Sequence, residues 1–395
     1  MNQQQVHRNI ILYYWLQLLA EPLFWGPILI TYIQNVGRMS LGQIYFMEAC
    51  CVMGVVLLDV PAGALADLIG RRRTIFWSRL LITLECLLFA AANNQLTVWL
   101  ANLIWVIAYS LMSNADSSLL IDTLKVAGRE KEFKNIIGKA NSYRLALMAI
   151  CSPLVGYLAN LNLRLPAYLS VIFIAANCLV ASRLIDPPVV EHYQKTWSGY
   201  YQLFKTSFGF VKNHRELKWI IIFSILISVI SKIWFFTYNP YFTLVDLPLK
   251  TFGWIFLALN ATAALSSYSS EWLYQKLGEF YSAVLMVLVV SLPIIAMGIF
   301  VSQAAALLVL LQNVARGYMT PLTNHMLHRY LNANNRATVA SFKSSAVSLG
   351  EVLSMWLFAY WLKIFSLTAC LQLLGITGLT FGLIILFSYQ PIFKH

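Results

Sequence analysis

Apolar runs of 18 or more residues recur along the whole chain and are separated by short polar segments. Runs of this length are typical of helices that span a bilayer, because about 20 helical residues cross its hydrocarbon core. Scanning the chain in windows of about 20 residues predicts twelve such helices. They lie at 10–34, 41–66, 74–94, 97–124, 137–160, 164–184, 217–243, 250–274, 280–301, 304–330, 336–362 and 366–389.

The longest polar segment runs from about residue 185 to 216 and begins with Asp186-Pro187-Pro188. Six predicted helices precede this segment and six follow it. We therefore predict an all-α membrane protein in which twelve transmembrane helices form two pseudo-symmetric six-helix bundles. The bundles are expected at 1–184 and 217–395, with 185–216 as a cytoplasmic linker.

Composition agrees with a membrane protein. Of 395 residues, 59% are hydrophobic and 11% are charged, with a mean hydropathy of +0.68, whereas a soluble domain carries about 25% charged residues. The net charge of +12 does not form a basic cluster on a soluble domain. It is better explained by membrane topology than by nucleic-acid binding. The predicted partners are the lipid bilayer and a small molecule, with no nucleic acid.

Lys and Arg residues are distributed unevenly between alternate loops. Nineteen lie on one side of the predicted membrane, four lie on the other, and the remaining five fall within helices. Because Lys and Arg are enriched in cytoplasmic loops, both termini are predicted to be cytoplasmic. The first apolar run holds Glu21, Pro22 and Pro27 and is too long for a signal peptide, so we expect it to be a retained helix.

The residue types that form metal or nucleotide sites do not occur here in the spacing that such sites require. All six cysteines lie in apolar runs and are interpreted as small core residues. His325 and His328 are three residues apart near a helix end, but no third ligand lies nearby. The segment GRRRT lacks the glycine and lysine spacing of a phosphate-binding loop. We predict no metal and no cofactor.

The two halves share weak internal similarity. The segment GALADLIGRRR (63–73) aligns with EWLYQKLGEFY (271–281), so that Gly70 corresponds to Gly278, and each segment follows the second helix of its half. The segments GKANS (138–142) and TVASF (338–342) open the fifth helix of each half. Such internal repeats are common in secondary transporters.

The segment GALADLIGRRR resembles the loop 2–3 signature of the major facilitator superfamily, although Leu68 stands where a basic residue is usual. The resemblance covers essentially the whole chain, since the six-plus-six helix pattern also agrees. It implies a monomeric secondary transporter that works by alternating access in the inner membrane of a bacterium. The matching positions are Gly63, Leu65, Asp67, Gly70 and Arg71 to Arg73.

The same segment suggests a conformational latch. Asp67 stands at a helix end, where a carboxylate can cap a neighbouring helix N-terminus. Arg71 can pair with Asp122, which lies at the same depth in the fourth helix. In the family, such a cluster latches the cytoplasmic side when the protein is open outward. For Arg72 and Arg73 the simpler interpretation, a basic membrane anchor, is favoured.

Several charges fall near predicted helix centres. A charge at the middle of a bilayer costs about 2.5 to 3.5 kcal/mol on insertion scales. These side chains must therefore face protein or water and pair with one another. They are Glu21, Glu85, Lys232, Arg316 and Glu351.

The resemblance implies that helices 1, 4, 7 and 10 line a central cavity. Helical spacing supports polar stripes on these helices, including Ser110, Asn114, Ser118 and Asp122 on the fourth, with Asp116 on another side. The aromatic members can equally be lipid-facing or core residues. The candidate cavity residues are Tyr14, Gln17, Glu21, Trp25, Asn114, Asp116, Lys232, Phe236, Asn239, Asn313, Arg316 and Thr320.

Roles follow from the charges. We hypothesise that Lys232 and Arg316 bind an anionic or polar group of the substrate. Glu21 is the leading candidate for proton coupling, because burial in the membrane lets a carboxyl exchange protons near neutral pH. The alternative is a set of interhelical ion pairs that only hold the halves together. The remaining proton-coupling candidates are Glu85, Asp116 and Glu351, and the candidates for packing or gate pairs are Glu48, Arg144 and Lys343.

The predicted function is proton-coupled secondary transport, not enzymatic catalysis. Export of a drug-like or amphipathic compound is favoured, although only Pro153 and Gly156 remain of the antiporter pattern in helix five. The alternative is uptake or export of a polar anionic metabolite such as a siderophore, which fits Lys232 and Arg316. The fourth helix lacks the central arginine of many proton-coupled members. A membrane sensor or enzyme on the same scaffold is the remaining class.

Overall fold

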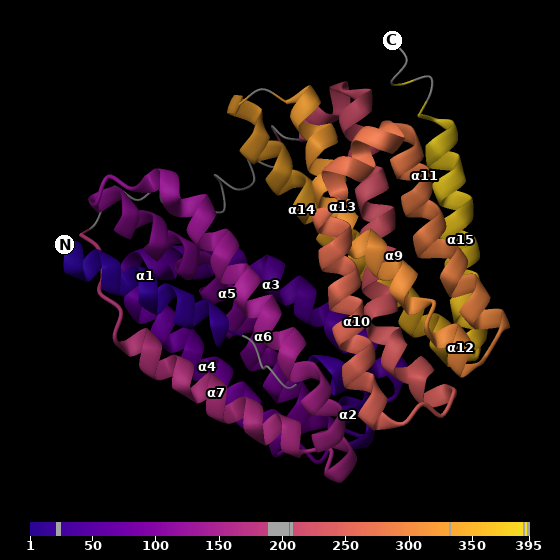
Figure 1. Cartoon of the computed structure of the whole chain (residues 1–395), viewed down its shortest axis with the longest axis horizontal. Helices are drawn as coiled ribbons and strands as arrows, with labels where there is room; N and C mark the ends of the chain where they lie inside the picture. The colour runs from indigo at the N-terminus through magenta and orange to yellow at the C-terminus, as the bar shows by residue number, and fades with distance from the viewer. Residues whose placement is uncertain (21–24, 189–204, 206–207, 332, 390–391, 393–395) are drawn as a thin grey trace. The chain divides into compact units, whose positions relative to one another are not determined.

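The computed structural model describes residues 1–20, 25–188, 205, 208–331, 333–389 and 392. For Asp67, Asn114, His328 and residues 333–338 it describes the backbone alone. Within these ranges the chain is almost entirely helical and has no β-strand (Figure 1). The predicted all-α fold is confirmed.

The N-terminal elements depart from the prediction at the first helix, which was expected to run unbroken over 10–34. Instead α1 ends at Leu18, and a 3-10 helix begins at Gly26 with Pro27 in its first turn. Proline lacks the N–H that a continuing helix requires, so it favours a fresh start there. The elements are α1 (Gln3–Leu18), η1 (Gly26–Ile28), α2 (Leu29–Asn35), α3 (Leu41–Ile69), α4 (Arg71–Ala90), α5 (Gln95–Val126), η2 (Glu130–Glu132), α6 (Phe133–Leu161) and α7 (Leu165–Ser182).

The C-terminal elements also include one predicted helix that is split. The expected helix 304–330 consists of the short α12, whose N-terminus is capped by Ser302, and the long α13. Another difference is that α11 begins at Ser270, well before the predicted start at 280, and bends at Gly278. The elements are α9 (Arg215–Leu244), α10 (Leu249–Tyr268), α11 (Ser270–Ile299), α12 (Gln303–Ala306), α13 (Val309–Tyr330), α14 (Ala333–Ile364) and α15 (Leu367–Phe387).

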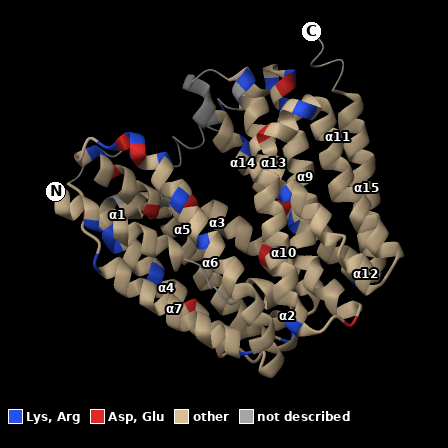
Figure 2. Ribbon diagram, in the orientation of Figure 1, with Lys and Arg blue, Asp and Glu red and all other residues tan. Residues whose placement is uncertain are grey.

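Nine of the described helices are long and apolar enough to cross a membrane. Figure 2 shows that most of their length is free of charged residues. The other predicted spans correspond to the broken first helix, to α4 and to α13. The last two carry charges inside the span, such as Arg79 and Glu85 in α4 and Arg316 in α13. The count of twelve stays a prediction.

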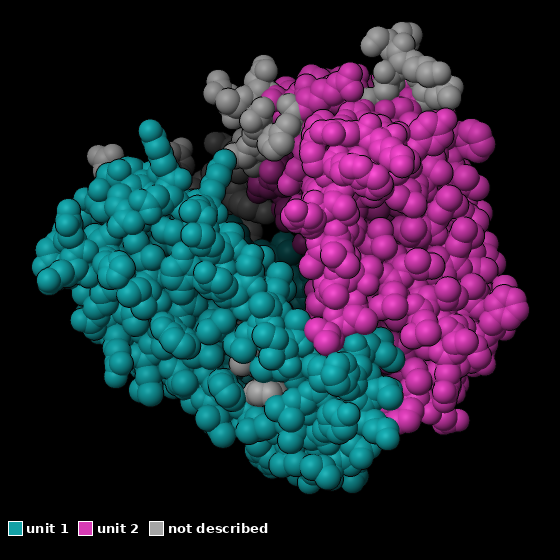
Figure 3. Space-filling view, viewed as in Figure 1, with its two compact units in different colours: residues 1–39, 51–200, 249–256 teal, residues 40–50, 201–248, 257–395 magenta. Residues whose placement is uncertain are grey.

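The chain forms two compact units, coloured separately in Figure 3. Unit 1 consists of residues 1–39, 51–200 and 249–256, and unit 2 consists of residues 40–50, 201–248 and 257–395. In unit 1, α4 packs along α5 and α7, and in unit 2, α11 packs along α15 and α13. Each unit therefore borrows one short segment from the other half of the sequence.

The segment that unit 1 borrows is held by close backbone contact. A Cβ atom added at Gly253 in α10 would lie 2.0 Å from the carbonyl oxygen of Ser152 in α6. Only glycine permits this approach. Membrane helices have no hydrophobic drive to associate, so small residues that let backbones meet are a main source of their packing energy. Gly253 therefore explains why the start of α10 belongs to unit 1.

Candidate functional site

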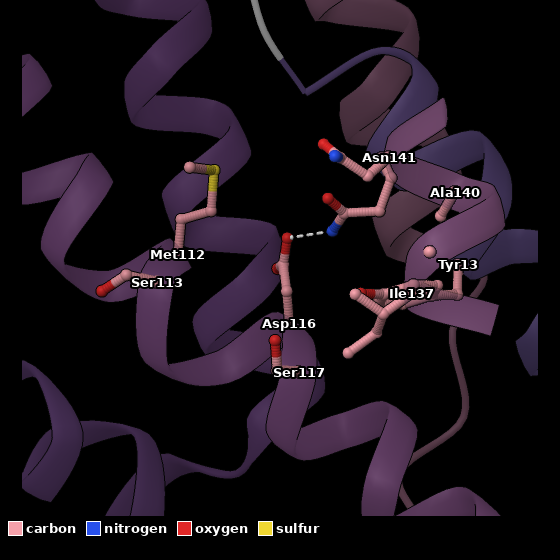
Figure 4. Close-up of a pocket in the computed structure, with 10 residues that line it drawn as sticks. Tyr13, Met112, Ser113, Asp116, Ser117, Ile137, Ala140 and Asn141 are labelled. Atoms are coloured by element: carbon pink, nitrogen blue, oxygen red, sulfur yellow. Dashed lines mark hydrogen bonds between the residues drawn. The ribbon is translucent and has the colours of Figure 1, made fainter. Parts of the chain in front are cut away.

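A cavity of about 300 Å³ lies inside unit 1, where α1, α5 and α6 meet. Figure 4 shows the side chains of Asp116 and Asn141 pointing into it from α5 and α6. Its wall combines hydroxyl and amide groups with an apolar part that is somewhat larger. The lining residues are Tyr13, Gln17, Met112, Ser113, Asp116, Ser117, Ile137, Gly138, Ala140 and Asn141.

Asp116 is the charged group of this cavity and is only 6% exposed. The amide nitrogen of Gln17 donates to its Oδ2 atom over 2.9 Å, and Nη2 of Arg79 donates to the same oxygen over 2.5 Å. The other oxygen, Oδ1, is buried and has no hydrogen-bond partner among the described residues. Leaving a buried acceptor unsatisfied costs about 1–3 kcal/mol. Asp116 therefore lines the cavity with a carboxylate whose Oδ1 atom has no partner among the described residues.

Arg79 lies behind the cavity on α4 and is completely buried. Its pairing with Asp116 cancels two charges that would each be costly in a bilayer. Breaking such a buried pair from one side is more destabilising than replacing both partners, because an uncompensated charge remains. The Nε and Nη1 atoms of Arg79 have no partner in the described part of the chain. The pair thus gives the site a negative oxygen without net charge.

The rest of the wall supplies neutral polar groups. Tyr13 interacts with Ser117 through a side-chain hydrogen bond. The carbonyl oxygen of Asn141 accepts a bond of 2.8 Å from Arg144. This contact orients the Asn141 amide. Ser113, Ser117 and Asn141 are exposed. The cavity therefore presents hydroxyl and amide donors and acceptors around one carboxylate.

Unit 2 contains a separate cluster of charges. Lys232 on α9 interacts electrostatically with both Glu48 on α3 and Glu351 on α14, and all three are half-buried. The Lys232 ammonium lies 5.4 Å from the centroid of the Phe236 ring. The structure therefore surrounds Lys232 with two carboxylates and an aromatic face. Glu48 reaches this cluster because residues 40–50 belong to unit 2.

Arg316 stands apart from that cluster. It is exposed on α13, and its Nη1 atom donates to Asn260 over 3.4 Å. Among the described residues it makes no ion pair, so its charge is available to a ligand. Thr320, one turn further on, is also exposed. Asn313 is buried and donates to the backbone of Val309 within its own helix.

Each unit also carries an ion pair at a helix end. In unit 1, Nε of Arg71 donates to Asp122 over 2.8 Å, which is the contact that the sequence predicted. In unit 2, Nη1 of Arg329 donates to Glu279 over 3.2 Å. We call these the N-terminal and the C-terminal helix-end pair. Arg71 follows Gly70, and Glu279 follows Gly278, at positions that the sequence alignment matched.

The N-terminus of α4 receives a carboxylate from the start of the linker. Asp186, at the start of the linker, accepts a bond of 2.8 Å from the backbone nitrogen of Arg72. A carboxylate here satisfies an unpaired N–H group and complements the helix dipole. Arg72 is more than an anchor, because its Nη2 atom donates to the carbonyl oxygen of Ser182 over 2.7 Å. The side chain of Asp67 lies outside the described residues, and Gly63 is buried in α3.

Residues 10–311 match the profile of the Major Facilitator Superfamily. The chain belongs to the Major Facilitator Superfamily. It is 24% identical over 366 residues to the uncharacterized MFS-type transporter YxaM of Bacillus subtilis (strain 168), and the alignment covers 89% of this chain and 88% of that relative.

Solved structures of the superfamily share the fold. A point mutant of the nucleoside transporter NupG has a TM-score of 0.78 at 13% identity and covers 98% of this chain and 100% of its own. A bacterial homolog of the human lysosomal transporter Spinster, in an inward-facing and unoccupied conformation, has a TM-score of 0.71 at 13% identity, covering 99% and 97%. A point mutant of the peptide transporter POT in complex with alafosfalin has a TM-score of 0.71 at 14% identity, covering 98% and 95%. These likenesses establish the superfamily fold for this chain.

The predicted cavity residues divide between several places in this superfamily member. Gln17 and Asp116 meet in the unit 1 cavity, and Lys232 lies near Phe236 in unit 2. Tyr14 packs against Tyr143 in a tilted arrangement, with ring centroids 5.8 Å apart, and is not among the residues that line the cavity. The cavity uses the face of α5 that carries Asp116, whereas the stripe expected from the sequence contains Ser110, Ser118 and Asp122. Glu21 lies outside the described residues, as does the side chain of Asn114.

Three other predicted residues are packed into their own units. Trp25 is buried against Phe89, with ring centroids 4.3 Å apart. Asn239 is buried on α9. Glu85 is buried on α4, where its Oε2 atom accepts a weak bond of 3.3 Å from Cys86. Glu85 thus has a thiol rather than a cation as its recorded partner.

The sequence interpretation missed Arg79, Asn141 and Glu279. Arg79 was detectable, because it is one of the five basic residues that fall within predicted helices. Asn141 lies in the predicted fifth helix, which was not assigned to the cavity. Glu279 aligns with Arg71, so a search for identical residues passes over it. In each case the sequence shows the residue type but does not show which residue its side chain contacts.

Proposed function

We propose that this superfamily transporter moves a small molecule across the bacterial inner membrane by proton-coupled alternating access. We further propose that the polar part of the substrate binds in the unit 1 cavity. The observation that supports this assignment is Asp116, a buried carboxylate whose Oδ1 atom has no partner among the described residues and which lines the cavity. An intramembrane ionisable residue is a functional-site hypothesis by default.

The chemistry of the cavity favours an uncharged hydrogen-bonding group. Arg79 compensates the charge of Asp116, so a cationic substrate gains little and an anionic one meets a carboxylate. The exposed hydroxyls and the Asn141 amide match a donor- and acceptor-rich group. Met112, Ile137 and Ala140 supply an apolar wall. A compound with a polar head and an apolar body fits this lining, which supports the favoured drug-like or amphipathic class.

The alternative substrate, a polar anionic metabolite, rests on a different observation. Arg316 is exposed in unit 2 and makes no ion pair within the described ranges. A guanidinium can bind a carboxylate or phosphate through two parallel hydrogen bonds. If the substrate is anionic, Arg316→Lys weakens its binding although the charge is kept, because the fork geometry is lost.

Comparing the metabolites and drug resistance of a deletion strain with those of its parent identifies the substrate. Transport is then measured in proteoliposomes for the wild type, Asp116→Asn and Asn141→Ala. We expect Asp116→Asn to lose transport and Asn141→Ala to transport with a higher KM. Ser142→Ala is the matched control, because Ser142 is exposed and bonds only the backbone of its own helix in the recorded contacts. Unchanged transport in Asp116→Asn would contradict the assignment of this cavity as the substrate-binding site.

We favour export over uptake, with both termini in the cytoplasm and the monomer as the working unit. Inverted and right-side-out vesicles separate the two directions. Export coupled to protons predicts substrate accumulation in inverted vesicles that are acidic inside, and its collapse when a protonophore is added. Accumulation only in right-side-out vesicles would reverse the direction.

A further inference from the structure

Three charged side chains from distant parts of the sequence share one region of unit 2. Glu48 comes from α3, Lys232 from α9 and Glu351 from α14, and Lys232 interacts electrostatically with both carboxylates. We call these residues the charge triad. All three are half-buried, so they are not sealed from exchange with their surroundings.

An aromatic cluster lies beside the triad on the same three helices. Tyr45 lies one turn before Glu48, Phe236 one turn after Lys232 and Phe358 two turns after Glu351. The Tyr45 ring centroid lies 6.0 Å from that of Phe236 and 4.9 Å from that of Phe358. The Tyr45 hydroxyl is hydrogen-bonded to the Ile233 carbonyl oxygen and to Thr237. These contacts fix α3 against α9 and α14, and so they hold the triad together.

The other titratable groups recorded near the triad carry no positive charge. Tyr45 is near the thiol of Cys370 on α15, and Cys50 on α3 is hydrogen-bonded to Trp356. A tyrosine and two cysteines are neutral at ordinary pH. Among the described residues, Lys232 is therefore the cation that compensates the two carboxylates.

The charges of the triad do not balance. Two ionised carboxylates and one ammonium sum to one negative charge. A net charge is costly within a bilayer, and one bound proton removes it. The Lys232 ammonium already lies over the Phe236 ring and interacts electrostatically with both carboxylates, which leaves it poorly placed to receive a substrate anion.

We propose that the charge triad is a proton site, in which one exchangeable proton is held by either Glu48 or Glu351 and Lys232 compensates the other carboxylate. This inference rests on the proposed proton-coupled transport and names residues that carry the coupling. A carboxylate oxygen gains the proton from water, and the same O–H bond breaks when the proton leaves. Lys232 thereby acts as a positioning charge rather than as a substrate-binding residue.

Infrared difference spectroscopy of the purified full-length protein tests the site without any substrate. The carboxyl C=O band is recorded between mildly acidic and mildly alkaline pH, where exposed carboxyls with pKa values of about 4 are already ionised. We expect the wild-type band to contain a component that Glu48→Gln with Glu351→Gln removes, beside the contribution of other buried carboxyls such as Glu85. Lys232→Gln should strengthen that component about twofold, because without the ammonium both carboxylates need a proton. Glu271→Gln is the control, since Glu271 is exposed on α11.

The outcomes separate this proposal from the function proposed above. An unchanged band in the double variant would overturn the proton site, as would a band that disappears when sodium replaces potassium in the buffer. If the double variant does not fold, the single variants Glu48→Gln and Glu351→Gln replace it, and each should weaken the band. The assay uses no substrate and leaves the Asp116 cavity untouched, so transport can fail its own test while the triad passes.

Discussion

The two helix-end pairs lie at matching positions of the two halves and carry their charges in the opposite order. In unit 1 a glycine is followed by the cation Arg71, whose partner Asp122 lies near the end of α5. In unit 2 a glycine is followed by the anion Glu279, whose partner Arg329 lies near the end of α13. The related halves have therefore kept an ion pair at one place without keeping the residues. What is common to both is the charge compensation of a helix end, and either order of charges provides it.

The environments of the two pairs differ. The side chains of Arg71 and Asp122 are 15% and 9% exposed, whereas those of Arg329 and Glu279 are 63% and 7% exposed. Glu279 compensates for its exposed partner with two further bonds of 3.0 Å, from the hydroxyls of Tyr274 and Tyr389. The first pair depends on the mutual burial of two charges. The second depends on one carboxylate that accepts from several donors.

The largest expected effect is the loss of the carboxylate from the N-terminal pair. Asp122→Ala removes a largely buried ion-pair partner of Arg71, so we expect the free energy of unfolding to fall by about 3 kcal/mol. Exchanging the charges, Arg71→Glu with Asp122→Arg, copies the order found in unit 2 and should recover part of the loss. A double-mutant cycle measured by SDS titration in mixed micelles should give a coupling of about 1–3 kcal/mol. A coupling of zero would mean that the two charges act independently.

The next effect tests the glycines that precede each pair. Gly70 has φ 89° and ψ 148°, and Gly278 has φ 69° and ψ −177°. This region is essentially restricted to glycine, so Gly70→Ala and Gly278→Ala should each destabilise by about 1–3 kcal/mol. An added Cβ would meet no close contact at either position, so the effect is backbone strain alone. Gly138→Ala, in an open helical position, is the control and should be neutral or slightly stabilising. Unequal losses at the two glycines would show that the halves are less alike than their backbones.

A smaller effect is expected from Glu279. Glu279→Ala removes the acceptor for Arg329 and for two tyrosine hydroxyls, and should lower the free energy of unfolding by about 1–2 kcal/mol. Glu279→Gln keeps an acceptor oxygen for the tyrosines and should lose less. The melting temperatures of the two variants in detergent give the comparison. If they melt together, the charge of Glu279 matters and its hydrogen bonds do not.

The smallest effect is expected from Arg329, because its side chain is mostly in solvent. Exposed ion pairs contribute about 0–1 kcal/mol and weaken as salt screens them. Arg329→Ala should therefore change the free energy of unfolding by less than Arg71→Ala does. Raising the ionic strength should shrink the Arg329 effect and leave most of the Arg71 effect. Equal salt dependence at both sites would contradict the difference in burial.

Several features of the fold and site followed directly from the sequence. Apolar run lengths predict the all-α membrane fold, and the motif around Gly70 predicts both the superfamily and the Arg71–Asp122 contact. The prediction of one continuous first helix was wrong, because a hydropathy scan does not detect the break before Pro27. The partner of Asp116 also escaped prediction. Its charge was visible, but which of five basic intramembrane residues faces it depends on how α4 rotates against α5.

The sequence by itself determined the class of protein, because bilayer insertion depends on the hydropathy of each segment, whatever its neighbours are. The sequence also places a glycine and a charged residue at each of these helix ends, because the backbone conformation that a glycine permits and the spacing of a motif are local properties. Only the tertiary structure decided that Arg79 neutralises Asp116, that Glu279 pairs with Arg329, and that Glu48 joins Lys232 and Glu351. Charge pairing acts over a few ångströms between helices far apart in sequence. It is therefore set by helix rotation and by the exchange of residues 40–50 into unit 2.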